Sequence, residues 1–106
     1  MYDKKNLTRI KKLNGLAPAV MKAFWEFDKL AVAEGAIPVK YKELIAVAVA
    51  ATTQCPYCVD IHMNNARKAG ATEAELAEAA IVAAALRAGG AITHATHALS
   101  DSTEAS

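Results

Sequence analysis

Alanine content is the feature that most constrains how this chain folds. Of the 106 residues, 25 are alanine, whereas Leu, Ile, Val and Phe together number only 23. Alanine loses no side-chain entropy in a helix and is depleted in strands, so the composition predicts an all-α protein. The length allows one domain, residues 1–106, because two domains would each be too small to sustain a core. Few bulky apolar residues bury little area per residue, which indicates an oligomer.

Net charge, the N-terminal residues and the length of the apolar runs bear on partners and location. The formal charge is only +1, so a bulk attraction to nucleic acid or to a membrane surface is not expected. Residues 1–42 carry a basic excess, which we interpret as the solvated face of the first helix. The N-terminus lacks the apolar core of a signal peptide, and no apolar run approaches the roughly 20 residues of a membrane span. We therefore expect a cytoplasmic protein.

Prolines, glycines and caps divide the chain into about six predicted helices. Asn14-Gly15 reads as a turn, and Gly89-Gly90 as the end of a helix. Thr72 and Glu75 form a capping box at the start of another helix. The predicted helices cover residues 7–13, 18–34, 38–53, 56–70, 73–89 and 91–99, and residues 100–106 form a frayed tail.

One stretch also fits a strand. Ile45, Val47 and Val49 alternate with alanines, which is a period-2 pattern. Nothing else in residues 56–99 alternates in this way, and one strand cannot make a sheet. We therefore predict a helix here.

The chemistry is concentrated in Cys55-Pro56-Tyr57-Cys58 and in His62, four residues further on. On a helix that starts near Pro56, both cysteines and the histidine fall within one narrow sector, and Cys58 and His62 can touch. The cysteines occupy the first turn, where free N–H groups and the helix dipole favour a thiolate. Two thiols this close are compatible with a disulfide, and the histidine can take a thiol proton.

Other uses of a C-x-x-C fit less well. Structural zinc needs a fourth ligand, and nothing in the sequence places His94 or His97 nearby. Haem attachment requires a histidine where Val59 stands. A glutaredoxin would require flanking strands and a cis-proline segment, which are missing. We interpret His94 and His97 as interface or helix-end residues, and expect no bound metal.

At this point the chain resembles the carboxymuconolactone decarboxylase-like superfamily, specifically its alkyl hydroperoxidase D-like branch. The resemblance covers the core at residues 40–99. It rests on Glu43, followed after eleven residues by Cys55, then Cys58 and His62. The downstream Gly70, the alanine-rich helix and the Arg87-Ala88-Gly89-Gly90 segment are also typical of the branch.

The resemblance implies an all-helical fold that assembles into trimers or hexamers, and a peroxidase acting on a small hydroperoxide. In that scheme Cys58 attacks the peroxide, Cys55 closes the disulfide, and Glu43 and His62 relay protons. The resemblance implies no bound cofactor; an external dithiol, such as a dihydrolipoyl protein, reduces the enzyme. Dedicated decarboxylases of the superfamily generally lack the cysteine pair, which argues against lactone decarboxylation. Reasoning from the residues alone mildly favours Cys55 as the attacking sulfur, because it lies at the helix cap, whereas Cys58 has the histidine one turn away. We follow the resemblance and expect Cys58 to attack.

Several roles stay open from sequence. A non-enzymatic, oligomeric redox-sensing or zinc-binding helical module is the alternative to an enzyme. Tyr57 either packs or lines the pocket of the site. Phe24, Trp25 and Phe27 are expected to be core or interface aromatics.

Overall fold

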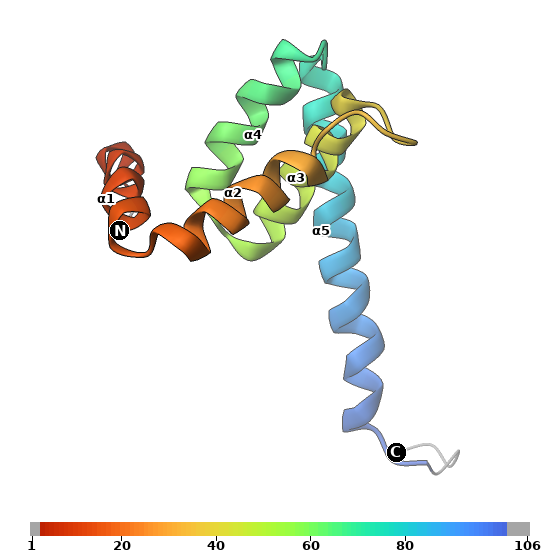
Figure 1. Cartoon of the computed structure of the whole chain (residues 1–106). Coiled ribbons are helices and arrows are strands. Elements are labelled where there is room, and N and C mark those ends of the chain that lie inside the picture. The colour runs from red at the N-terminus through yellow and green to blue at the C-terminus, as the bar shows by residue number, and fades with distance from the viewer. Residues whose placement is uncertain (1–2, 102–106) are drawn as a thin grey trace.

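The structure, a computed structural model, describes residues 3–101. It confirms the all-α fold, with no strand among these residues. Within residues 3–101, five α-helices follow one another, with a short 3₁₀ helix at each end of the series (Figure 1). In order, the elements are a 3₁₀ helix at Lys4–Arg9, α1 at Ile10–Leu16, α2 at Pro18–Ala31, α3 at Val39–Thr53, α4 at Pro56–Lys68, α5 at Glu73–Ala95 and a 3₁₀ helix at Thr96–Ala98.

The three prolines set three helix starts, as the sequence predicts. Pro18 and Pro56 occupy the first turns of α2 and α4, and Pro38 is the N-cap of α3. Proline suits these positions because its φ is already helical and the missing N–H would have no partner inside the helix. The cysteine pair therefore begins α4, as expected.

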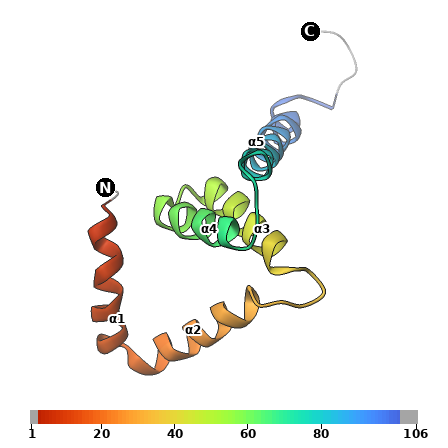
Figure 2. The ribbon, with the colours of Figure 1, turned by 90° about the horizontal axis from the view of Figure 1, so that it is seen from above.

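Helices α3, α4 and α5 form the packed part of the molecule. Helix α3 contacts both α4 and α5, and the three lie together in both views (Figures 1 and 2). The core between them consists of Val47, Ala66 and Leu76, one residue from each helix. Leu44, Met63 and Ala71 pack around it. The core is small: among the described residues it has six, two of which are alanine.

Burial along α3 explains its alternating pattern. Glu43, Val47 and Ala50 are buried, and their spacing of four and three residues is that of one helix face. Ile45 and Val49, which suggested a strand, are 51% and 54% exposed. The prediction of a helix is therefore confirmed.

The predicted turn at Asn14-Gly15 is wrong. Both residues lie inside α1, and the chain bends instead at Ala17, whose φ of −136° is extended. A residue before proline is held out of the helical region by the ring of the next residue, and Pro18 follows. The next helix also ends earlier than expected, at Ala31 rather than Glu34.

The predicted break at Gly89-Gly90 is also wrong. Helix α5 runs through both glycines to Ala95, so the separate helix expected at residues 91–99 does not exist. Interior glycine weakens a helix by about 1 kcal/mol, and the alanine-rich sequence around the pair tolerates that loss. Only Thr96–Ala98 is 3₁₀, and of the predicted tail Ser100 and Asp101 are described while residues 102–106 lie outside the described part.

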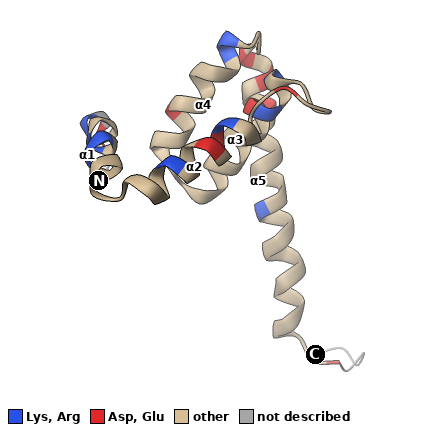
Figure 3. Ribbon diagram, viewed as in Figure 1, with Lys and Arg blue, Asp and Glu red and all other residues tan. Residues whose placement is uncertain are grey.

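Continuity makes α5 unusually long and apolar. By length and composition alone, residues Glu73–Ala98 would suffice to cross a membrane. From the sequence we expect no run of this length, because two separate helices are predicted here. The acidic residues of α5 lie in its first two turns and Arg87 lies further along it, as the coloured ribbon shows (Figure 3). Little of the segment is buried within this chain.

The molecule is elongated. Its radius of gyration is 18.7 Å, against about 13 Å for a compact domain of this size. Helices α1 and α2 form an arm beside the α3–α4 pair, and α5 projects away from it (Figures 1 and 2). On the arm, Val20 and Phe27 are 70% and 69% exposed, and Phe24 is exposed as well. The aromatic face of α2 is therefore not a core within the single chain.

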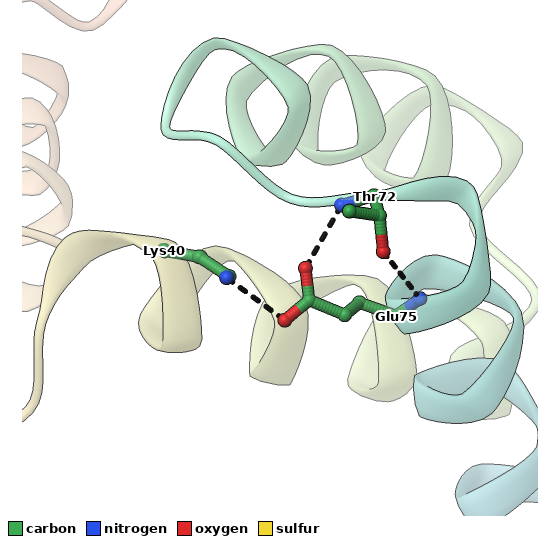
Figure 4. A network of polar contacts seen from close by, with 3 residues as sticks. All are labelled: Lys40, Thr72 and Glu75. Carbon is green, nitrogen blue, oxygen red and sulfur yellow. Dashed lines mark hydrogen bonds and ion pairs between the residues drawn. The ribbon is translucent and has the colours of Figure 1, made fainter.

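The start of α5 is tied to α3 by a small polar network (Figure 4). The Thr72 hydroxyl accepts from the Glu75 N–H, and the Glu75 carboxylate accepts from the Thr72 N–H, which is the predicted capping box. The second carboxylate oxygen of Glu75 lies 2.8 Å from Nζ of Lys40. One glutamate thus caps α5 and contacts the first turn of α3.

We expect Thr72→Ala to lower the free energy of unfolding by about 1 kcal/mol, because the N-cap acceptor is lost. Urea denaturation followed by circular dichroism, at fixed protein concentration, measures the change. Thr93→Ala, the same substitution inside the same helix, is the matched control and should have little effect. Equal losses in both variants would contradict the capping role.

Candidate active site

The link between α3 and α4 places the cysteines. Gln54 ends α3 in the left-handed region, with φ of 56°, which a residue other than glycine adopts only rarely. The Cys55 N–H donates to the Ala50 carbonyl over 3.1 Å, and the Arg87 guanidinium donates to the Thr52 carbonyl at the end of α3. These contacts satisfy carbonyls left open at the helix end and hold the link in one conformation.

Cys55 is the N-cap of α4. Its sulfur accepts a hydrogen bond from the Cys58 N–H, with Sγ and N separated by 3.3 Å. Both cysteines are free thiols and half-buried. A sulfur in the N-cap position faces the free N–H groups and the positive end of the helix dipole. The reduced pair is therefore arranged to hold negative charge on Cys55.

The two thiols differ in acidity. Hydrogen bonds from the Cys58 thiol and the Cys58 N–H lower the pKa of Cys55. The same thiol contact, together with burial and the charges of Cys55 and Asp28, raises the pKa of Cys58 to about 11. Cys55 is thus the sulfur that ionises first, in agreement with the inference from its place at the helix cap.

Glu43 and His62 form a pair across α3 and α4. The Oε2 atom of Glu43 lies 2.6 Å from Nδ1 of His62. Glu43 is only 3% exposed, and a buried carboxylate requires such a partner. With the Glu43 carboxylate accepting from Nδ1–H, the Nε2 atom of His62 is the one that exchanges protons. His62 lies one turn after Cys58 on α4, so the Glu43–His62 pair lies between α3 and α4 about one helical turn beyond the cysteine pair, which begins α4.

Tyr57 lies between the cysteines in sequence but faces the N-terminal segment. Its hydroxyl accepts from the Asp3 N–H at 3.0 Å and from Nδ2 of Asn6 at 2.9 Å. It lines a small hollow with Leu7 and Ile10. Tyr57 is not among the residues that line the hollow at Cys55.

That larger hollow, of about 570 Å³, opens at Cys55 and was not anticipated from sequence. Val59 and Met63 form its apolar wall on α4, and Ala51 lies opposite on α3. The repeat of four residues from Cys55 to Val59 and Met63 is the signal that places them on one helix face.

The zinc alternative finds no site in the structure. Among residues 3–101, no three His, Cys, Asp or Glu side chains are grouped closely enough to hold a metal ion. His94 and His97 contact each other, with ring centroids 4.8 Å apart, at the end of α5 that projects away from α3 and α4 (Figure 1). They do not join the cysteine pair.

We expect Cys58→Ala to raise the pKa of Cys55, because the larger of the contacts that lower it is removed. The rate of alkylation by iodoacetamide against pH, with mass spectrometry to identify the modified thiol, gives the midpoint. The midpoint should move to higher pH in Cys58→Ala and less far in Cys58→Ser, which keeps a hydroxyl donor. If Cys58 is alkylated before Cys55 in the unaltered protein, the expected order of acidity is wrong.

Two bacterial proteins are similar to this chain over most of its length. One, from Paracoccus denitrificans, is described as uncharacterized protein 4 in the cox locus; it is 49% identical over 77 residues, which is 73% of this chain and 69% of the relative. An uncharacterized protein of Cupriavidus necator is 40% identical over 79 residues, 71% of this chain and 70% of the relative.

Two crystal structures are similar in fold and sequence. A protein from Methanobacterium thermoautotrophicum has a TM-score of 0.79 and 38% identity, over 83% of this chain and 99% of that one. The apo form of a carboxymuconolactone decarboxylase family protein from Legionella pneumophila has a TM-score of 0.75 and 33% identity, over 88% and 83% of the two chains. The model of that family matches residues 18–101. With the helical fold and these relatives, this chain belongs to the carboxymuconolactone decarboxylase family.

Proposed function

We propose that the chain is a thiol-dependent hydroperoxide reductase, or more broadly a disulfide oxidoreductase, that cycles Cys55 and Cys58 between thiols and a disulfide. The observation that carries the proposal is the Cys55 sulfur at the start of α4, 3.3 Å from the Cys58 N–H and with a lowered pKa. A stabilised thiolate is the reactive form of cysteine. Membership of a family that includes enzymes supports the proposal.

The proposed reaction has two steps. The Cys55 thiolate attacks the distal oxygen of the hydroperoxide; an S–O bond forms, the O–O bond breaks, and the alkoxide takes a proton and leaves as the alcohol. The Cys58 sulfur then attacks the resulting sulfenic acid; an S–S bond forms and water leaves. The protein has lost two electrons, and an external dithiol, such as a dihydrolipoyl group on a partner protein, returns them. The reducing cytoplasm is the compartment that suits this cycle.

This order of attack departs from the order implied by the resemblance, in which Cys58 attacks first. The physical reason is acidity: Cys58, with its pKa raised to about 11, is a thiol at neutral pH and donates to Cys55. In the second step Cys58 must lose its proton. His62, one turn along α4 and held by Glu43, is the base that we assign to this proton transfer.

The test is multiple-turnover consumption of tert-butyl hydroperoxide with dihydrolipoamide as the donor. Cys55→Ser and Cys58→Ser should each reduce turnover to background. His62→Ala should lower kcat about a hundredfold, the usual contribution of a general base. His94→Ala, which removes a histidine far from the pair, is the matched control and should turn over normally.

One outcome separates an enzyme from a sensor. If the disulfide forms once, slowly, and dihydrolipoamide gives no further turnover, the non-enzymatic redox-sensing alternative holds and the proposed function is wrong. If Cys55→Ser retains a single-turnover reaction with peroxide while Cys58→Ser does not, Cys58 is the attacking sulfur.

We further propose that the chain works as a homo-oligomer, a trimer or hexamer. The elongated shape and the exposed apolar side chains on α5, such as Leu86 and Ile92, support a surface covered by other copies. Contact with lipid fits less well, because Arg87 lies in the middle of α5 and contacts α3.

Light scattering after size exclusion tests the assembly. The unaltered chain should elute as three or six copies, and Ile92→Glu should shift it towards smaller species because a charge would be buried in the interface. Lys68→Glu, on the exposed last turn of α4, is the control and should leave the mass unchanged. A monomeric unaltered chain would contradict the proposal.

A further inference from the structure

A continuous apolar groove runs from Cys55 along α4. It consists of the hollow at Cys55 and a second hollow of about 420 Å³. The two share Ala51, Val59 and Met63, so they are parts of one groove. The second hollow extends between α4 and α5 and ends at Arg67 and Glu73.

One face of α4 forms the floor of this groove. Cys55, Val59, Met63 and Arg67 follow at intervals of four residues, which places them on one face of the helix. Twelve residues at 1.5 Å each separate the two ends by about 18 Å. The opposite walls are apolar: Val47 and Ala51 on α3, and Leu76, Ala77 and Ala80 on α5. Cys55 thus lies at one end of an apolar groove, and Arg67, with Glu73 in the same lining, lies at the other.

The far end favours an anion. Arg67 is exposed, and within residues 3–101 its guanidinium has neither an ion-pair nor a hydrogen-bond partner. A guanidinium binds a carboxylate through two parallel hydrogen bonds. The first turn of α5, which begins at Glu73, adds the positive end of its helix dipole. The Glu73 carboxylate repels an anion at this end, so its neutralisation should strengthen anion binding there.

We propose that this groove binds a long-chain fatty acid hydroperoxide, with its carboxylate on Arg67, its chain along Val59 and Met63, and its peroxide group at Cys55. The inference rests on the proposed function, because it names the substrate class of the same site. Because the two ends of the groove are about 18 Å apart along α4, the proposed substrate is one whose carboxylate and peroxide group are separated by a long chain, with the peroxide group towards the methyl end. Cys55 takes the distal oxygen, and the hydroxy fatty acid leaves. A small hydroperoxide, as expected from the resemblance, would occupy only the hollow at Cys55.

The first experiment compares two substrates that differ only in charge: the linoleic acid hydroperoxide with its peroxide group towards the methyl end, and its methyl ester. In Arg67→Gln, the ratio of kcat/KM for the acid to that for the ester should fall about tenfold, as expected from the loss of a charge-assisted hydrogen bond. In Glu73→Gln the ratio should rise. Lys68→Gln, the neighbouring cation on another face of α4, is the matched control and should leave the ratio unchanged.

The second experiment blocks the groove beyond the reacting sulfur. Ala80 is exposed and lines only the distant hollow, so Ala80→Phe should lower the ratio of kcat/KM for the fatty acid hydroperoxide to that for tert-butyl hydroperoxide. If Ala80→Phe instead changes the mass of the assembly and leaves this ratio unchanged, a second copy of the chain occupies the groove and the inference is wrong. Equal use of acid and ester by both the unaltered chain and Arg67→Gln also overturns it.

A binding measurement separates this inference from the proposed function. Cys55→Ser protein has no reactive thiolate at the groove, and unoxidised linoleic acid is unreactive towards it. Calorimetry should show saturable binding that weakens in Cys55→Ser/Arg67→Gln. Binding without peroxide turnover by the unaltered chain would contradict the proposed function and support the groove. Turnover of tert-butyl hydroperoxide without linoleic acid binding would do the reverse.

Discussion

A buried carboxylate constrains the packed part of this molecule. Glu43 is enclosed between α3 and α4, and an unpaired charge in that position would be strongly destabilising. His62 is the partner that α4 provides, so the hydrogen bond between them fixes how far the two helices are displaced along each other. Ala66, with no exposed surface, lies one turn further along α4 and lets α3 approach closely. The cysteine pair is positioned because it lies at the joined end of these same two helices.

Features that depend on neighbours in sequence could be predicted. The prolines determined helix starts, Thr72 and Glu75 form their capping box, and the spacing of Cys55, Cys58 and His62 follows from helix geometry. The pairing of Glu43 with His62 came from the family resemblance and could not be derived from composition. Glycine misled at Asn14-Gly15 and at Gly89-Gly90, whereas Gly70, with a φ of 98°, lies just past the end of α4 as predicted. At Gly89-Gly90 the alanines on either side offset the helix penalty of about 1 kcal/mol per glycine.

The sequence could not show which elements lie opposite a given helix face. Arg67 reads as an ordinary charged residue of a helix end until α5 is seen to close the groove beside it. The aromatic face of α2 has the pattern of a core, yet within residues 3–101 Phe27 is 69% exposed. The pattern records that a face is to be buried, and it carries no information on whether the covering surface belongs to the same copy.

The hydrogen bonds to the Cys55 sulfur have a consequence for redox equilibrium. The Cys58 N–H and the start of α4 stabilise a thiolate, but the sulfur of a disulfide carries no charge for them to stabilise. The reduced protein therefore gains free energy that the oxidised protein does not, and the reduction potential of the pair rises. A pair of this kind passes its disulfide on readily to another dithiol. In the proposed cycle, the same turn of helix that activates the sulfur would thus also make the reduction of the disulfide thermodynamically favourable.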